Sequence, residues 1–590
     1  MKPWSQLEQA GQLAAADVEI AEGLGRVCQE SDPEVLLTLA LVSREVQAGN
    51  VCLDLERWAD RELTDPAQAP LWRLPRAADW RAKLARSPLV NVGGPEGEPK
   101  PLVLDADGRL YFTRYYEHEL ALARRVRALG TGSPASSAPP AGTEPASELL
   151  ERLFPPLPAG QPDQQRAAVV AARQRQLSLI VGGPGTGKTS TVVKLLAVLV
   201  ADRLAQQRTL PRILLTAPTG KAAQRLAESI ERARDQLPVE PRIKAAIPST
   251  ASTIHRALGP VASSSTRFRH HRDNPLACDI FLLDEASMVD LALMRRLLDA
   301  IPEHARIIML GDPDQLVSVE AGGVLGDLCT SASDPASPLA SALSRLTHSY
   351  RYPKDSGIAA LANAVHAQDA RTVLDVLRSS LPDVSYGPAV TRATLTRSLE
   401  AEAKRNYRPL HEPELERKLS ALDAYRVLCA HRRGHGGVEE LNLALARLVS
   451  GRLRRPEDNY AGRPIMITHN EYTTRLFNGD VGVLHKLERA GLSAHFRVGP
   501  QNVRNLSLAR LPRHESVYAM TVHKSQGSEF DAVAIVLPER PSPILSRELL
   551  YTAITRAKQT VSIHASEAAL KAAVGQRSER ASGLVERLRD

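Results

Sequence analysis

Residues Leu177–Thr189 read LSLIVGGPGTGKT, an apolar run followed by a glycine-rich turn. The run predicts a buried strand, and the amphipathic stretch Ser190–Leu204 predicts the helix that leaves the turn. The pattern G-x-x-x-x-G-K-[ST] between them is typical of a phosphate-binding loop, in which backbone N–H groups and a helix N-terminus surround a polyphosphate. In such a loop Lys188 reaches the β- and γ-phosphates, and the Thr189 hydroxyl ligates Mg²⁺. The sequence therefore predicts a protein that binds a nucleoside triphosphate and Mg²⁺.

Composition sets broad limits on what else the chain does. Its 590 residues are enough for roughly three or four domains. The net charge of +8 is a mild excess, which is compatible with an anionic partner such as a nucleic acid. The sequence has no run of about eighteen apolar residues, so we expect no membrane span. We also expect no secretory signal, because the N-terminus lacks a charged segment followed by an apolar one.

The cysteines argue against a metal cluster or a disulfide framework. They are few and far apart, and none forms a C-x-x-C pair. We therefore expect reduced, mostly buried thiols, which is typical of a cytoplasmic protein. The five positions are Cys28, Cys52, Cys278, Cys329 and Cys429.

The chain divides into regions of different character. Residues 1–128 are rich in Ala, Leu and Glu and predict a mostly helical N-terminal domain, with a hairpin near Leu102–Tyr111. Residues 129–150 are rich in Gly, Ser, Pro and Ala and predict a flexible linker. Beyond the linker, short apolar strands alternate with amphipathic helices, which predicts parallel sheets covered by helices on both faces.

Two such α/β cores are expected, at 151–343 and 344–590. Within the second, a turn-rich and strand-rich stretch at about 478–512 predicts a small β insertion. The strands expected in the first core are Leu177–Val181, Ile213–Ala217, Ile280–Asp284 and Ile307–Leu310. Those expected in the second are Ala424–Ala430, Ile465–Thr468 and Ala532–Leu537.

Polar residues that follow two of these strands extend the nucleotide site. Asp284 would hold Mg²⁺ through water, and Glu285 would orient and deprotonate the attacking water. Gln315 would sense the γ-phosphate by gaining or losing one hydrogen bond. The simpler interpretations are a polar strand end at Asp284 and Glu285 and a polar turn at Gln315. We favour the catalytic roles because both features follow a phosphate-binding loop.

Two arginines are candidates for arginine fingers. Arg351 and Arg556 both fall in the expected second core, from which a guanidinium reaching across a cleft would stabilise the transferring phosphoryl group. An isolated arginine is more often a solvated surface charge. The surrounding motifs, Ser349–Tyr352 and Tyr551–Lys558, favour the catalytic interpretation.

Taken in order, these motifs resemble those of superfamily 1 DNA helicases. The matching stretches are Gly182–Thr189, Ala217–Ala223, Asp284–Glu285, Gly311–Leu316, Ser349–Arg351, Val522–Asp531 and Tyr551–Lys558. Finer detail resembles the RecD family, the alpha subunits of exodeoxyribonuclease V (RecBCD). That detail lies in Gly182–Thr189, Asp284–Asp290 and Leu476–Asp480 and, more loosely, in Gly49–Leu53 and Leu110–Glu117.

The resemblance implies two RecA-like cores and a motor that moves 5′ to 3′ on single-stranded DNA using ATP. It also implies an N-terminal domain that binds partners, and a heterotrimer with RecB-like and RecC-like subunits. Such a complex acts on duplex DNA ends in double-strand break repair and recombination.

The resemblance also assigns roles at the nucleotide. Gln165 would read the adenine edge, although Gln164 stands where many relatives have a stacking aromatic. Gly527 and Glu529 would approach the nucleotide from the second core. The complete set of expected nucleotide contacts is Gln165, Gly182, Gly183, Pro184, Gly185, Thr186, Gly187, Lys188, Thr189, Ser190, Gly527 and Glu529.

A track for nucleic acid is expected from hydroxyl, ammonium and imidazole groups near strand ends. Phosphate contacts hold a strand without reading its sequence, which suits a translocating motor. The candidates are Thr219, Lys221, Thr253, His255, Thr521 and His523. The basic run Arg267–Arg272 would touch DNA or a partner, or would be a solvated loop.

Three alternatives stay open at this point. The chain would be a stand-alone RecD-like helicase, or a scaffold subunit in which ATP acts as a switch, and the track would be RNA instead of DNA. A dead motor is disfavoured because Lys188, Asp284, Glu285 and Arg556 are all present. We expect no nuclease site in this chain.

Overall fold

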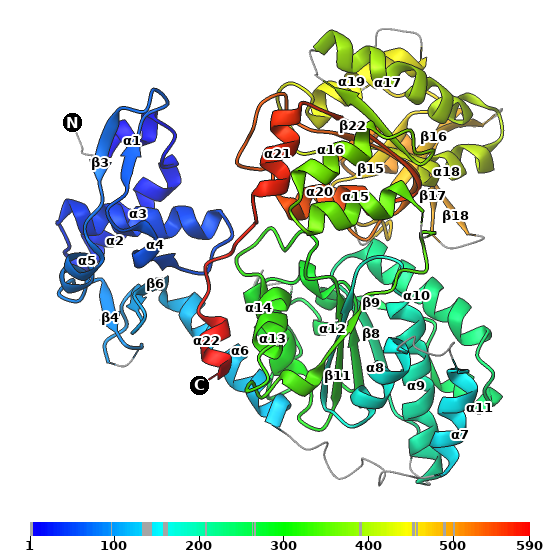
Figure 1. Ribbon diagram of the computed structural model, residues 1–590, viewed down its shortest axis with the longest axis horizontal. Helices are drawn as coiled ribbons and strands as arrows, with labels where there is room; N and C mark the ends of the chain where they lie inside the picture. The colour runs from blue at the N-terminus through cyan, green and yellow to red at the C-terminus, as the bar shows by residue number, and fades with distance from the viewer. Residues whose placement is uncertain are drawn as a thin grey trace.

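The computed structural model describes residues 4–95, 97–131, 144–156, 163–206, 209–261, 264, 267–353, 355–388, 392–450, 455, 458–471, 473–487, 491–498 and 502–589. The expected linker at 129–150 falls partly outside these ranges, since residues 132–143 are not described. Figure 1 shows three bodies: an N-terminal region in blue, a first α/β core in cyan to green, and a second in yellow-green to red.

The first core is built on a six-stranded parallel sheet in the order β12-β7-β11-β10-β8-β9. Its central strands are continuous apolar runs, as expected where both faces of a sheet are covered. One apolar cluster lies under α13 and α14, and another lies under α8, α9 and α10. The strands are β7 (Leu177–Gly182), β8 (Ile213–Ala217), β9 (Ser252–Thr253), β10 (Ile280–Leu283), β11 (Arg306–Gly311) and β12 (Leu343–Leu346). The helices are α7 (Glu144–Leu153), α8 (Gln164–Arg173), α9 (Lys188–Ala205), α10 (Gly220–Asp235), α11 (Pro241–Ala246), α12 (Ile254–Leu258), α13 (Leu291–Ala300) and α14 (Val324–Ala332).

The second core has a five-stranded parallel sheet in the order β13-β22-β21-β14-β20. The expected class, two parallel-sheet α/β cores, is therefore confirmed. The strands are β13 (Val384–Pro388), β14 (Tyr425–Cys429), β20 (Ala519–Thr521), β21 (Phe530–Val536) and β22 (Ala557–Ala565). The helices are α15 (Gly357–His366), α16 (Ala370–Arg378), α17 (Arg392–Tyr407), α18 (Leu415–Ala424), α19 (Val438–Ser450), α20 (Arg547–Ile554) and α21 (Glu567–Gly575).

A separate antiparallel sheet, in the order β18-β17-β16-β15-β19, forms the insertion in the second core. One expectation was wrong here: the strand near Ile465–Thr468 is β15 of this sheet and not part of the parallel core. Its four residues are all buried, so its apolar pattern does not distinguish it from a buried parallel strand. The strands are β15 (Pro464–Ile467), β16 (Val481–Leu487), β17 (Gly491–Arg497), β18 (Val503–Ser507) and β19 (His514–Ser516).

The N-terminal region contains more β structure than the composition predicted. The expected hairpin is present as β5 and β6, and it belongs to a four-stranded sheet in the order β1-β6-β5-β4. The strands are β1 (Leu53–Asp54), β2 (Glu62–Thr64), β3 (Pro70–Arg73), β4 (Val90–Val92), β5 (Leu102–Leu104) and β6 (Arg109–Phe112). The helices are α1 (Ser5–Gln9), α2 (Ala15–Cys28), α3 (Pro33–Gln47), α4 (Leu55–Trp58), α5 (Ala77–Leu84) and α6 (Thr113–Thr131).

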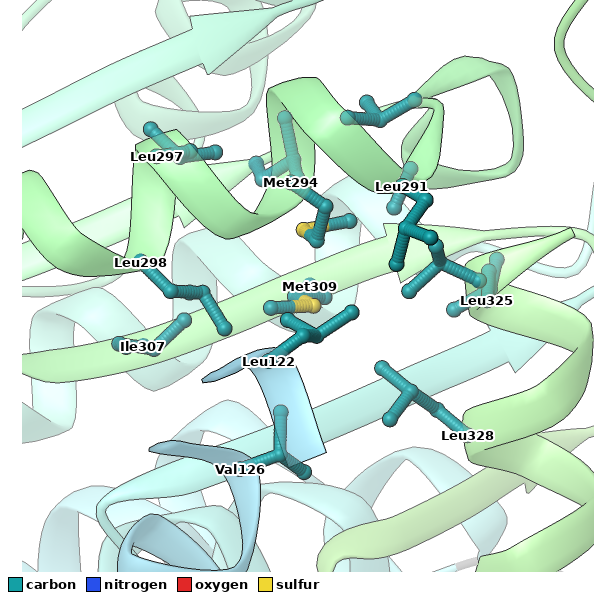
Figure 2. Packing of buried hydrophobic residues seen from close by; sticks show 14 of the residues in the cluster. Leu122, Val126, Leu291, Met294, Leu297, Leu298, Ile307, Met309, Leu325 and Leu328 are labelled. Carbon is teal, nitrogen blue, oxygen red and sulfur yellow. The ribbon is translucent and has the colours of Figure 1, made fainter. Parts of the chain in front are cut away.

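Helix α6 joins the N-terminal region to the first core. Figure 2 shows Leu122 and Val126 of α6 packed among Met294 of α13, Met309 of β11 and Leu328 of α14. The C-terminal segment returns to the same place: it leaves α21 in the second core and ends in α22 (Leu584–Arg589), beside α6 (Figure 1). Within the described ranges, no helix combines the length and the apolar character that crossing a membrane requires.

Candidate functional site

The phosphate-binding loop connects β7 to α9. Gly185 and Gly187 have φ values of +79° and +81°, a region that favours glycine. A Cβ at Gly182 would lie 2.3 Å from the Leu346 carbonyl oxygen, so only glycine fits there. The Lys188 ammonium donates to the carbonyl oxygens of Gly182 at 2.5 Å and Gly183 at 3.0 Å. The lysine is thus held against its own loop, within reach of the space that the loop encloses.

The acidic pair lies at the end of β10, next to this loop. Burial and the neighbouring Glu285 charge raise the pKa of Asp284, while the Lys188 charge opposes the shift. Glu285 has φ +52°, a left-handed conformation that is uncommon for a residue with a side chain. Such strain often marks a functional position. A carboxylate and the Thr189 hydroxyl are hard oxygen donors that suit Mg²⁺.

Gln315 follows β11 and is held on both sides of its amide. Its Nε2 donates to Asp312 Oδ2 at 3.0 Å, and its Oε1 accepts from the guanidinium of Arg556. Arg556 comes from the second core and is only 3% exposed. It also donates to the carbonyl oxygens of Ser528 at 3.1 Å and Thr552 at 3.3 Å. A buried guanidinium therefore spans the two cores beside the segment that follows β11.

Arg351 lies elsewhere than its expected position inside the second core. It is in the segment between β12 of the first core and α15, and the preceding Tyr350 N–H donates to Gly185 O at 2.8 Å. Its guanidinium reaches Glu529 of the second core at 2.5 Å. Burial alone would raise the pKa of Glu529, but the charges of Arg351 and Arg225 lower it overall. Arg351 therefore points from the phosphate-binding loop toward the second core.

The opposite end of the loop faces Gln165 of α8. Its Nε2 lies 3.4 Å from Thr186 O, and a Cβ at Gly187 would lie 2.3 Å from it. Gln164, at the position where many relatives have an aromatic, accepts from the Thr347 N–H at 2.8 Å.

Sequence reasoning missed an aromatic at this end, Tyr350. Its side chain is 62% exposed, and its ring approaches a Cβ built at Gly187 to 3.8 Å. Its position directly before Arg351 was the available signal. An exposed aromatic ring beside the loop is suited to stack on a nucleotide base.

Together these groups line one cavity of about 510 Å³ between the two cores. Polar side chains from both cores face it, as a bound triphosphate would require. Gly182 and Gly183 of the loop, and Gln165 beside it, do not line this cavity. The expected residues that the cavity brings together are Pro184, Gly185, Thr186, Gly187, Lys188, Thr189, Ser190, Asp284, Glu285, Gln315, Arg351, Gly527, Glu529 and Arg556. The lining residues that sequence reasoning missed include Arg225, Asp312 and Lys558.

Three of the expected DNA contacts are threonines in equivalent local structures. The Oγ1 atoms of Thr219 and Thr253 accept from Ala222 N and Arg256 N, both at 3.2 Å. Thr521 accepts in the same way from Lys524 N at 3.3 Å. Thr253 ends the edge strand of the first sheet and Thr521 the edge strand of the second. Each hydroxyl is fixed as an acceptor and keeps its O–H for donation, for example to a phosphate oxygen.

The other three expected DNA contacts are a lysine and two histidines. The Lys221 ammonium lies 5.8 Å from the Phe530 ring of the second core, and burial lowers its pKa to about 7. His255 packs edge-on against Phe268 at 5.8 Å, and burial lowers its pKa. Burial likewise lowers the pKa of His523. Their contact with DNA stays a prediction, and Lys221 faces the interface between the cores.

The basic run Arg267–Arg272 begins where the chain turns back and pairs with residues before it. Phe268 pairs with Pro260 in an antiparallel bridge, and the Arg296 guanidinium lies 5.9 Å from its ring. His271 lies 3.6 Å from Asp273, a contact that is ionic only when the imidazole is protonated. A DNA or partner contact for this run stays a prediction.

Models of three protein families match the chain in order. They are the RecBCD enzyme subunit RecD, N-terminal domain, at residues 9–111, an AAA domain at 165–321, and a UvrD-like helicase C-terminal domain at 516–563. The matched ranges cover the N-terminal region, most of the first core, and the part of the second core that contains Gly527, Glu529 and Arg556.

Relatives extend this similarity to nearly the whole chain. The RecBCD enzyme subunit RecD of Mycolicibacterium smegmatis is 38% identical over 98% of both chains. That of Haemophilus influenzae is 33% identical over 94% of this chain and 93% of its own. The ATP-dependent RecD2 DNA helicase of Deinococcus radiodurans is 32% identical over 87% of this chain and 64% of its own. The chain therefore belongs to the RecD family of RecBCD enzyme subunits.

Proposed function

We propose that the chain is an ATP-dependent DNA helicase that moves 5′ to 3′ on single-stranded DNA as a subunit of a RecBCD-type complex. The observation that carries the proposal is the buried contact between Arg556 of the second core and Gln315 of the first, at the rim of the nucleotide cavity. A guanidinium in this position links closure of the two cores to charge on the transferring phosphoryl group. The direction of movement rests on the family resemblance.

Hydrolysis uses groups from both sides of the cavity. The loop N–H groups and Lys188 hold the phosphates, and Glu285 accepts a proton from the attacking water. Bound Mg²⁺, ligated by Thr189 and through water by Asp284, would neutralise charge on the β- and γ-phosphates. Arg556 donates to the γ-phosphate oxygens as charge develops there, and Arg351 supports it from the loop side.

The base binds at the end of the loop marked by Gln165 and Tyr350. We propose that the Tyr350 ring stacks on the adenine and that the Gln165 amide hydrogen-bonds its edge. This places the aromatic role on Tyr350, after the phosphate-binding loop in sequence, and accounts for the absence of an aromatic at position 164.

Movement follows from closing and opening of the cavity. ATP draws the cores together through its contacts with both, and hydrolysis lets them part. Thr219 and Thr253 on the first core and Thr521 on the second would hold the DNA backbone in turn, so each cycle advances the motor along one strand. Separating one base-pair step costs about 1.4 kcal/mol, well within what one hydrolysis event supplies.

We favour the hypothesis that the chain is a subunit of a RecBCD-type complex over the hypothesis that it is a stand-alone helicase. The chain covers 98% of the length of the Mycolicibacterium RecD subunit but 64% of the Deinococcus RecD2 helicase. We therefore propose RecB-like and RecC-like partners, with nuclease activity outside this chain. We also propose a cytoplasmic location, in line with free thiols at all five cysteines.

Strand displacement by the purified chain, alone and with RecB-like and RecC-like partners, tests this function. The substrates are duplexes with a 5′ or a 3′ single-stranded tail. We expect ATP-dependent unwinding from the 5′ tail that increases in the complex. Unwinding from the 3′ tail by the chain alone would contradict the polarity. Unwinding that partners do not affect would favour the stand-alone helicase, and DNA binding without unwinding would favour the scaffold.

A further inference from the structure

Helix α10 of the first core lies against the second core through its first two turns. A Cβ at Gly220 would lie 3.5 Å from Phe477 Cβ of the insertion, and one at Gly527 would lie 3.2 Å from Ala222 Cβ. The Lys221 ammonium faces the Phe530 ring at 5.8 Å. The same helix begins at Thr219, one of the expected DNA contacts. One short stretch of helix thus touches the second core and borders the expected DNA path.

Arg225, on the second turn of α10, extends this contact into the nucleotide cavity. Its Nη2 donates to the carbonyl oxygen of Glu529 at 3.2 Å, and the residue lines the cavity. Glu529 is the residue whose carboxylate binds Arg351. Arg225 therefore holds the main chain of a residue whose side chain is bound from the phosphate-binding loop.

The charges around Arg225 suit a group that responds to a bound anion. Burial lowers its pKa, and the neighbouring Arg556 charge lowers it further, while Glu529 and Glu285 act in the opposite direction. Among the described residues, its hydrogen-bond acceptor across the cleft is a neutral carbonyl oxygen, that of Glu529. A triphosphate bound between Lys188 and Arg556 would relieve the repulsion between Arg225 and Arg556, and so strengthen the contact with Glu529.

Thr219 and Arg225 lie close enough along α10 for a movement at one to shift the other. At a rise of about 1.5 Å per residue, Thr219 and Arg225 are separated by roughly 9 Å along α10. A hydrogen-bonded helix transmits a shift over that length with little internal change. A displacement of the α10 N-terminus by a bound strand therefore moves Arg225 relative to Glu529.

We propose that Arg225 is a positioning residue that couples DNA binding at the start of α10 to closure of the nucleotide cavity. The proposal rests on the proposed function, because it assigns the coupling within that motor. Arg225 acts through Glu529 and the main chain of the second core. This coupling accounts for how a DNA strand held by Thr219 alters the position of Arg556 relative to Gln315.

Thermodynamic coupling is the readout that separates this role from a structural one. Nucleotide and DNA change each other's affinity by the same factor, typically 5-fold to 150-fold in allosteric proteins, or about 1–3 kcal/mol. We would measure the Kd for fluorescein-labelled oligo-dT, by anisotropy, with and without a non-hydrolysable ATP analogue and Mg²⁺. The protein is the full chain in complex with its partner subunits, because the proposed function places it there.

We expect the analogue to change the Kd of the unmodified protein at least fivefold and that of Arg225→Met less than twofold. Arg225→Lys, which keeps a charged donor, should recover part of the factor. The control is Arg242→Met, at an exposed arginine of α11, which should keep the full factor. The melting temperature of each variant checks the fold.

Two outcomes would overturn the proposal. The first is an unchanged factor in Arg225→Met, and if the Kd values with and without the analogue also shift equally, the role of Arg225 is purely structural. The second is loss of the factor in Arg242→Met as well. Failure of the proposed function would look different: the unmodified protein would lack ATP-dependent strand displacement, whatever the Arg225 variants do.

Discussion

Arg556 of the second core donates a hydrogen bond to Gln315 of the first, and its other described hydrogen-bond partners are the main-chain carbonyls of Ser528 and Thr552. Each of these acceptors is a neutral oxygen. A buried guanidinium is costly unless its charge is compensated. The site is therefore arranged to accept an anion, and the loop that carries Lys188 supplies the place for it.

Replacing Lys188 by Ala should abolish DNA-stimulated ATP hydrolysis while leaving the fold intact. The ammonium now donates to Gly182 and Gly183 of its own loop, and these bonds contribute roughly 1 kcal/mol each to stability. Its larger role is to bind the phosphates, and loss of one such donor lowers kcat about 10²–10³-fold. Steady-state ATPase assays with oligo-dT, together with thermal unfolding, check this. Unchanged ATP turnover in Lys188→Ala would contradict the assignment of residues Gly182–Thr189 as a phosphate-binding loop.

Replacing Tyr350 by Ala should weaken ATP binding and leave kcat nearly unchanged. The exposed ring contributes base stacking, worth about 1 kcal/mol or more, so KM for ATP should rise roughly 5-fold to 10-fold. Tyr350→Phe is the matched control, because it keeps the ring. A similar KM in Tyr350→Ala and the unmodified protein would show that the base does not stack there.

The C-terminal helix is fixed by a buried ion pair, and breaking it should release the tail. Glu119 is 0% exposed and accepts from Tyr111, Ser582, Gly583 and Arg587, the last at 2.8 Å. Removing one partner of a buried pair costs about 3–5 kcal/mol. We expect Arg587→Met to lower the melting temperature and to expose the tail to limited proteolysis.

A double variant separates the cost of the unpaired Glu119 charge from loss of packing. Adding Glu119→Met to Arg587→Met should recover part of the stability, because replacement of a whole buried pair is often close to neutral. If Arg587→Met alone leaves both the melting temperature and the cleavage pattern unchanged, the pair does not hold the tail.

His118 should make the junction between α6 and the first core sensitive to acid. Burial and the charges of Arg295, Arg296 and Arg114 lower its pKa from 6.5 to about 4. The unfolded chain therefore binds this proton at higher pH than the folded protein does. The stabilising effect is complete above pH 6.5 and is lost as the pH falls toward about 4.

The matched variant is His118→Phe, which keeps a ring against Tyr115. Melting temperatures at pH 7.5 and pH 5 check the effect. Between pH 7.5 and pH 5 we expect the melting temperature of the unmodified protein to fall more than that of the variant. An equal fall would contradict the role of His118.

The sequence predicted correctly those strands and helices whose local residue pattern matches their environment in the folded protein. The strand before the phosphate-binding loop and the helix after it are β7 and α9, and Ile213–Ala217 is β8. Buried parallel strands read as continuous apolar runs, and glycine is required where φ is positive. The family assignment likewise followed from motif order, and relatives 33–38% identical over nearly the whole chain confirm it.

The features that the sequence misplaced or did not reveal share a physical cause: each depends on which segments pack against each other in the folded chain. The strand at Ile465–Thr468 has the same apolar character in either sheet, so its pattern could not place it in the insertion. The ammonium of Lys221 faces Phe530 only because the cores meet along α10. Arg225 reaches the cavity, and Tyr350 reaches the phosphate-binding loop, through contacts between segments far apart in sequence.

The central claim is that Arg556 joins the second core to the hydrolysis site. ATP affinity and single-turnover hydrolysis, measured on one preparation of Arg556→Ala, test it most directly. The account predicts a Kd for ATP close to that of the unmodified protein and a hydrolysis rate lower by ~10³-fold or more. Lost ATP binding, or hydrolysis at the unmodified rate, would contradict it.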